Sequence, residues 1–62
     1  MPNKIPKYIK FRYRNKERLW VAVDRVDGNF YIGKLANHPI SKGIKYGDPI
    51  KVNKANVIDV QF

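Results

Sequence analysis

The chain has 62 residues, 44% of them hydrophobic, a composition that excludes a disordered protein and fits one small globular domain. It contains no cysteine, which excludes disulfides and thiolate chemistry and favours a reducing compartment, so we expect a cytoplasmic protein. The formal net charge is +8, and residues 1–18 hold seven Lys and Arg residues against Glu17 alone, an asymmetry that predicts a polyanionic partner.

The start of the chain is predicted to be a flexible segment, residues 1–6, of a single domain that spans residues 1–62. No apolar run has the length of a signal peptide or of a membrane-spanning helix. We therefore expect neither secretion nor a membrane partner.

The first predicted strand lies in the stretch KYIKFRYRNKER, residues 7–18, where the residue type alternates with a period of two. One face of this strand is apolar and consists of Ile9, Phe11 and Tyr13. The opposite face is basic with one aromatic residue and consists of Tyr8, Lys10, Arg12 and Arg14. A helix would mix these two sets, so the pattern predicts a strand.

Residues 15–17 form a polar break of hairpin-loop length, and RLWVAVDRV at 18–26 is predicted to be a second strand. That strand is apolar on both sides or bends between two sheets. Its Trp20 is predicted to be a packing centre of the core, with a ligand-stacking platform as the alternative. The turn DGN at 27–29 and the third strand FYIGKL at 30–35 complete a hairpin. Gly33 indicates a bulge, a bend or a close backbone approach in that strand.

The second half of the chain begins with a predicted loop, residues 36–49, whose apolar side chains are expected to cover one open end of the core: Ile40, Ile44 and Tyr46. Residues 50–53 are predicted to form a fourth strand, and residues 54–56 a tight or 3₁₀ turn. Residues 57–62 are predicted to form a fifth strand with one apolar face: Ile58, Val60 and Phe62. Asp27 and Asp48 are expected to make turns in which their carboxylates accept hydrogen bonds from the backbone N–H groups that follow them.

Five short strands without a convincing helix predict an all-β fold, namely a small, five-stranded, partly open SH3-like barrel. An OB-type barrel is the alternative, and it is disfavoured because 62 residues leave little room for longer strands and a capping helix.

Several short motifs follow one another along the chain, in the order ERLWVAV, VDG, IGKLAN with HP, KG, YGDPIKV and VIDV. This order resembles the YegJ-like family, a bacterial domain family of uncharacterised function. The similarity covers residues 9–62, and it implies a set of mainly fold-forming positions: Glu17, Trp20, Asp27, Gly28, Gly33, Leu35, Asn37, Pro39, Gly47 and Asp48. The chain departs from the family at Arg18, where the family has histidine, and at Val60, where it has an aromatic residue. The resemblance favours the barrel and implies no chemistry.

Catalysis is disfavoured by the residues available. The chain has one histidine, one serine and no threonine, and His38 and Ser41 flank Pro39 in a predicted loop where nothing orients them. No pair of residues has the spacing typical of a metal site. We therefore expect no enzyme, no metal and no cofactor.

The basic and aromatic residues are the remaining candidates for function. Alternate residues on a strand lie about 6.5 to 7 Å apart, close to the spacing of phosphates along one nucleic-acid strand. Tyr8 and Tyr31 are candidates for stacking on unpaired bases. The predicted nucleic-acid-binding residues are Tyr8, Lys10, Arg12, Arg14, Lys16, Arg18 and Tyr31.

Two functions are favoured by the sequence over a third alternative, an enzyme or a purely structural subunit. The first is a module that binds DNA or RNA mainly through phosphates, with little sequence preference. The second is a protein-interaction or regulatory module that docks on an acidic protein. The basic row also has a purely solubilising interpretation, because positive residues discourage edge pairing of strands. We expect a monomer or a dimer through the edges of the sheet.

Overall fold

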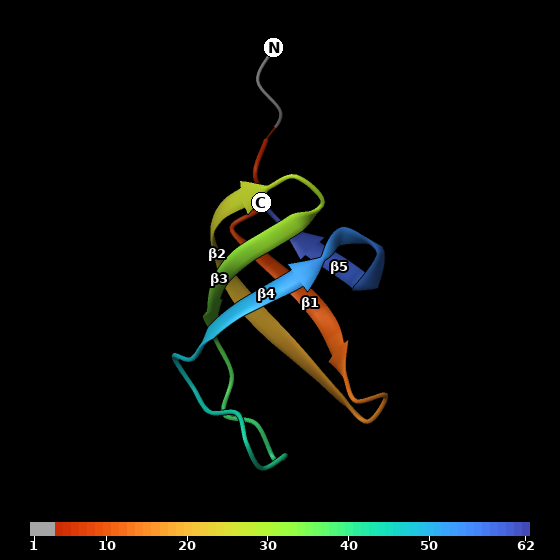
Figure 1. Cartoon of the computed structure of the whole chain (residues 1–62), viewed down its shortest axis with the longest axis vertical. Coiled ribbons are helices and arrows are strands. Elements are labelled where there is room, and N and C mark those ends of the chain that lie inside the picture. Colours follow the sequence, from red (N-terminus) through yellow and green to blue (C-terminus); the bar gives the residue numbers. More distant parts are fainter. Residues whose placement is uncertain (1–3) are drawn as a thin grey trace.

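The computed structural model describes residues 4–62 and contains one sheet of five antiparallel strands (Figure 1). The strands and the single 3₁₀ turn of this part of the chain are β1 (Tyr8–Tyr13), β2 (Glu17–Asp27), β3 (Phe30–Leu35), β4 (Pro49–Asn53), η1 (Lys54–Asn56) and β5 (Val57–Gln61). The order across the sheet is β4-β3-β2-β1-β5, so β1 lies between β2 and the last strand. The all-β prediction, its five strands and the 3₁₀ turn at 54–56 are confirmed.

The β1–β2 hairpin follows from the alternation in its sequence. Its turn is closed by the N–H of Lys16, which donates to the carbonyl of Tyr13 at 3.0 Å. Arg14 and Asn15 occupy the turn with φ of 53° and 56°, the positive values that type I′ hairpin turns require. Because the loop is only residues 14–16, Glu17 begins β2 instead of belonging to the polar break.

The β2–β3 hairpin has a two-residue loop, and Gly28 in it has φ of 59°, so this predicted turn is confirmed. Further along, the register shifts between Val23 and Arg25, opposite Gly33. A Cβ on Gly33 would lie 2.0 Å from the carbonyl oxygen of Ala22, which only glycine avoids. Gly33 therefore marks both a bulge and a close backbone approach, as predicted.

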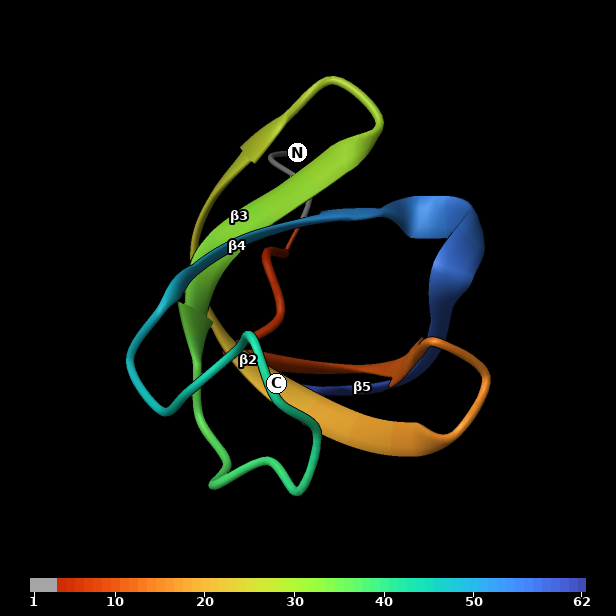
Figure 2. The same ribbon diagram turned by 60° about the horizontal axis from the view of Figure 1, so that its bottom comes forward.

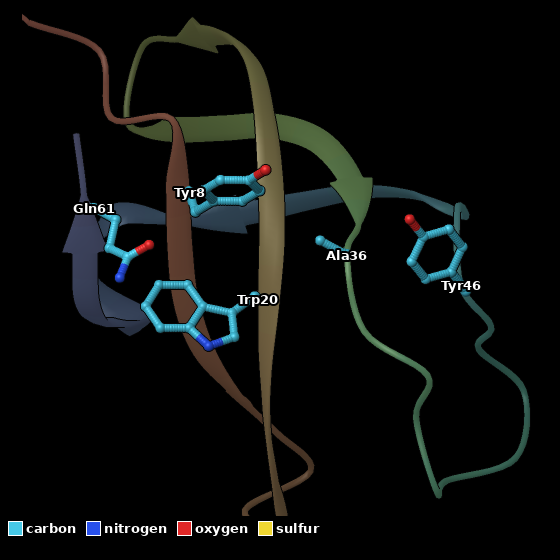
Figure 3. A pocket seen from close by; sticks show the side chains of 5 residues that line it. All are labelled: Tyr8, Trp20, Ala36, Tyr46 and Gln61. Atoms are coloured by element: carbon cyan, nitrogen blue, oxygen red, sulfur yellow. The ribbon is translucent and has the colours of Figure 1, made fainter.

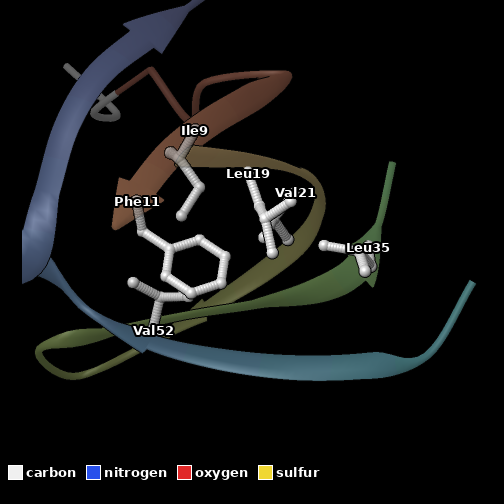
Figure 4. Packing of buried hydrophobic residues seen from close by; sticks show 6 residues of the cluster. All are labelled: Ile9, Phe11, Leu19, Val21, Leu35 and Val52. Atoms are coloured by element: carbon white, nitrogen blue, oxygen red, sulfur yellow. The ribbon is translucent and has the colours of Figure 1, made fainter. Parts of the chain in front are cut away.

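The bulge lets the long strand β2 bend, so that it pairs with β1 on one side of the molecule and with β3 on the other. Figure 2 shows β2 curving from the side of β1 and β5 to the side of β3 and β4. The core lies inside this curve and consists of six buried side chains (Figure 4): Ile9, Phe11, Leu19, Val21, Leu35 and Val52. Each strand except β5 contributes at least one of them, because the pleat turns every second residue of a strand to the same face.

Trp20 is not part of this core, and the prediction that it is a packing centre is wrong. Leu19 and Val21 are 2% and 0% exposed on the inner face of β2. The pleat therefore turns Trp20, which lies between them, to the outer face, where it is half-buried.

The sheet is not closed, and β4 and β5 are its two edges. On β5 a register shift against β1 accompanies Val57, which packs against the core. The residues predicted to share an apolar face are 45%, 38% and 66% exposed: Ile58, Val60 and Phe62. The register keeps Val60 opposite Ile9, on the inner side, and the bulge places Val57, in place of Ile58, opposite Phe11, so the prediction is wrong for Ile58.

The loop between β3 and β4 extends at the bottom of Figure 1 and contains no strand. Ile44 packs against the core, as predicted, but Ile40 is 92% exposed and Tyr46 is 58% exposed, so they do not cover it. The Asp48 carboxylate accepts the N–H of Lys45 at 3.0 Å, which confirms its role in a turn, although the donor precedes it.

At the amino terminus, the predicted flexible segment 1–6 falls partly on residues 1–3, which lie outside the described residues. Pro6 is buried, and the N–H of Lys7 donates to the carbonyl of Gln61 at 2.8 Å. Within residues 4–62, none of the helical structure has the length and hydrophobicity that crossing a membrane requires.

Candidate nucleic-acid interface

The outer face of β1 and β2 carries three cations on neighbouring strands. The register places Arg12 directly opposite Arg18 and Lys10 directly opposite Trp20. Their neighbours in sequence, Ile9 and Phe11 among them, point into the core, so the pleat directs the cations outward. Like charges opposite each other destabilise a strand pair, and a bound polyanion would relieve that repulsion.

The turn of the same hairpin adds two cations. Arg14 and Lys16 are exposed, and the guanidinium carbon of Arg14 lies 5.2 Å from the centre of the Tyr13 ring. The structure thus places all five of the predicted binding cations on one hairpin. We call this set the basic hairpin: Lys10, Arg12, Arg14, Lys16 and Arg18.

Two aromatic residues lie beside these cations on the outer face. Tyr8 pairs with Ala22, and Lys10 pairs with Trp20, so Tyr8 and Trp20 are diagonal neighbours on one face. Both are half-buried, and Figure 3 shows their rings on the same side of β1 and β2. The Lys10 Nζ lies 4.8 Å from the centre of the Trp20 ring, a cation–π contact.

The two rings line a shallow hollow of about 350 Å³ (Figure 3). Its lining comes from four parts of the chain, namely β1, β2, β5 and the β3–β4 loop, and consists of Tyr8, Trp20, Ala36, Tyr46 and Gln61. Gln61 lies opposite Tyr8 across the β1–β5 pair. Tyr46 is braced by His38, whose ring stacks on it with 4.8 Å between centroids and 17° between planes.

The backbone of Trp20 is held by the segment that follows β3. The N–H of Ala36 donates to the carbonyl of Trp20 at 2.8 Å, and the N–H of Trp20 donates to the Asn37 Oδ1. Asn37 takes the place of a strand partner for Trp20, because the ladder between β2 and β3 ends at Leu35.

Glu17 lies three residues before Trp20 on β2 and holds the β3–β4 loop by hydrogen bonds. Its carboxylate accepts the N–H of Ile40 at 2.6 Å and the N–H of Ser41 at 3.1 Å. The Ile40 N–H, with smaller contributions from Ser41, holds the pKa of Glu17 below its ordinary value, because these donors stabilise the ionised form.

Tyr31 does not join the other predicted binding residues. It lies opposite Val52 on the inner side of β3 and packs against the core. The Lys54 Nζ lies 5.4 Å from its ring. Tyr31 is therefore separated from Tyr8 by the sheet.

Sequence reasoning missed Trp20 and Gln61 as surface residues beside the cations. The signal for Trp20 was its position between Leu19 and Val21, both apolar and both needed inside. Gln61 carried no local signal, because its neighbour Tyr8 is more than fifty residues away in the chain.

Comparison of the chain with family models, with curated proteins and with solved structures finds no match. The resemblance to the YegJ-like family therefore stays a prediction. Among residues 4–62 there is no group of three or more His, Asp or Glu side chains that could hold a metal ion. The arrangement of the outer face is thus the feature from which a function has to be argued.

Proposed function

We propose that the protein is a non-enzymatic module that binds nucleic acid, mainly through phosphate contacts and with little sequence preference. The observation that supports this function best is the basic hairpin with Tyr8 and Trp20 on the same outer face. The cations attract phosphates by releasing counterions, and the rings offer flat surfaces to bases. The described part of the chain offers no helix that reads a groove, so we expect weak sequence preference.

An acidic protein is the alternative partner. Acidic side chains would match the cations equally well. They would not use the aromatic rings beside Lys10, whereas a nucleic acid supplies both negative charges and planar groups at regular spacing. The combination of charge and rings therefore favours the nucleic acid.

The test is the salt dependence of binding to a generic oligonucleotide. With two to four phosphate contacts, affinity should fall about 10- to 150-fold between about 50 and 200 mM salt. The variant Arg12→Ala should lower the slope of log affinity against log salt by about one. A titration at several salt concentrations measures both quantities.

The matched control is Lys51→Ala, which removes the same charge from an exposed position on β4. It should leave the salt slope nearly unchanged, since β4 lies across the molecule from β1 (Figure 2). Affinity no higher than that of an unstructured peptide of charge +8 would contradict the proposal. Equal effects of Arg12→Ala and Lys51→Ala would contradict the assignment to the basic hairpin.

For the fold, we propose the partly open SH3-like barrel. The sheet order, which puts β1 between β2 and β5, supports it, together with the bent β2 and the 3₁₀ turn before β5. The cytoplasm, as the compartment of a cysteine-free protein, and membership of the YegJ-like family are parts of the same proposal.

A further inference from the structure

We propose that the hollow beside the basic hairpin binds one unpaired base, so that the ligand is a single-stranded polynucleotide and not a duplex. This inference rests on the proposed function and names its substrate class. It starts from the hollow of about 350 Å³ lined by Tyr8, Trp20, Ala36, Tyr46 and Gln61.

The shape and lining of the hollow suit a planar base. Three of its five lining residues are aromatic, and its volume is within the range of small-molecule sites. The Lys10 Nζ already lies 4.8 Å from the Trp20 ring, at the edge between the hollow and the cations. A strand with phosphates on Lys10 and Arg12 can therefore direct the intervening base toward Tyr8 and Trp20.

Polar groups at the rim can contact the edge of the base. The Gln61 amide contains both a donor and an acceptor, and the hydroxyl groups of Tyr8 and Tyr46 can each do both. Because such groups pair with any base edge, this lining is compatible with weak sequence preference.

A duplex cannot use the hollow without losing a base pair. Its bases are stacked and paired, and exposing one of them has a free-energy cost of its own. Only its phosphates would contact the protein, through the basic hairpin. Stacking should therefore separate single strands from duplexes, by about 5- to 150-fold in affinity for one base.

The protein contains a single tryptophan, which makes the test direct. Trp20 fluorescence is titrated at low salt with a twelve-nucleotide oligo(dT), a twelve-nucleotide oligo(U), a DNA duplex of similar total charge and a polyglutamate peptide. Both single strands should quench Trp20 and bind more tightly than the duplex. A difference between oligo(dT) and oligo(U) then identifies DNA or RNA as the preferred ligand.

A variant assigns the effect to the hollow. Tyr8→Leu keeps an apolar side chain of β1 while removing the ring, and it should weaken single-strand binding about 5- to 150-fold. Its duplex affinity and its salt slope should stay unchanged. Phe62→Ala is the matched control, because Phe62 is an aromatic residue, 66% exposed, that does not line the hollow.

The outcomes separate this inference from the proposed function. Steep salt dependence with equal affinity for single strands and duplex, and no quenching, would overturn the base site and leave phosphate binding in place. Binding to neither nucleic acid, or tighter binding to polyglutamate, would overturn both. The quenching of Trp20 fluorescence is measured in the wild-type protein. The test therefore decides between these outcomes even if the Tyr8→Leu variant fails to fold.

Discussion

Arg14 combines an unfavourable backbone conformation with a charge at the tip of the basic hairpin. Its φ of 53° lies in the left-handed region, which costs an ordinary residue about 1 to 2 kcal/mol. Type I′ turns usually have Asn, Asp or Gly at this position. An exposed cation in an unfavourable backbone conformation supports the proposal that the Arg14 side chain acts together with Arg12 in binding.

The variant Arg14→Asn should stabilise the protein while weakening its binding. Asn adopts the left-handed conformation readily, and losing the contact of Arg14 with Tyr13 costs about 0.5 to 1 kcal/mol. The free energy of unfolding should therefore rise by up to about 1.5 kcal/mol, measured by chemical denaturation. Oligonucleotide affinity and its salt slope should fall in parallel. A less stable variant would mean that the turn has no strain to relieve.

Trp20 illustrates how the residues on either side of a position in a strand determine whether its side chain is buried. A lone tryptophan in a small protein suggests a core position, yet Leu19 and Val21 occupy the inner face of the same strand. Since a strand cannot turn consecutive side chains to one face, Trp20 is directed outward.

At the scale of elements, the β3–β4 loop acts as a side wall of the hollow. It contributes Ala36 and Tyr46, and it is held against β2 by Glu17 and Asn37. A backbone hydrogen bond also holds the two ends of the loop together, since the N–H of Gly47 donates to the carbonyl of Leu35 at 2.9 Å. The hollow therefore depends on anchors that contact no ligand.

The Glu17 anchor should make stability depend on pH. Its pKa is lowered in the folded state, mainly by the Ile40 N–H, so its contribution is complete above the ordinary pKa of glutamate. The contribution is lost as the pH falls through the folded pKa, because protonation removes the charge that these donors stabilise. The stability difference between the wild type and Glu17→Gln should thus be largest near about pH 7 and shrink toward about pH 3.

Chemical denaturation of both proteins across this range is the measurement. A difference that stays constant with pH would show that the carboxylate gains nothing from Ile40 and Ser41. Glu17→Gln should also reduce the quenching of Trp20 by single strands at neutral pH, since it loosens the wall that carries Tyr46.

At the scale of the whole molecule, the net charge of +8 opposes folding. The Cα radius of gyration is 11.1 Å, so most charges lie within one Debye length of each other at about 0.01 M salt, where that length is about 30 Å. At about 0.15 M salt the length is about 8 Å, and most of the repulsion is screened. Arg12 and Arg18, which pair directly, add a local repulsion.

Sodium chloride should therefore raise the thermal midpoint of unfolding. Between about 0.01 and 0.15 M salt we expect a gain of about 1 kcal/mol, equivalent to about 4 to 8 °C in a domain of this size. A thermal melt followed by circular dichroism at several salt concentrations measures it. The same salt weakens oligonucleotide binding, so stability and affinity should move in opposite directions. A midpoint that falls with salt would mean that attractive charge pairs outweigh the repulsion.

Much of the fold could be predicted because it is encoded locally. The alternation of β1 separates Ile9 and Phe11 from Lys10 and Arg12 within four residues, and Gly28 marks the hairpin turn between β2 and β3. The outward placement of Lys10 and Arg12 followed from the same period, whereas Arg14, which was predicted to share that face, lies in the turn after β1. β5 was harder, because its bulge against β1 changes which residue faces the core.

The sequence by itself determined five strands, their hairpin turns and the separation of cations from apolar side chains along β1, because these depend on residues that are close in the chain. Only the tertiary structure decided that Gln61 lies beside Tyr8, that Asn37 holds Trp20 and that Tyr31 faces the core. These relations join segments far apart in sequence, and they follow from how the bent sheet buries its few large apolar side chains. The period of a strand specifies two faces, but the packing of the whole chain decides which face meets solvent.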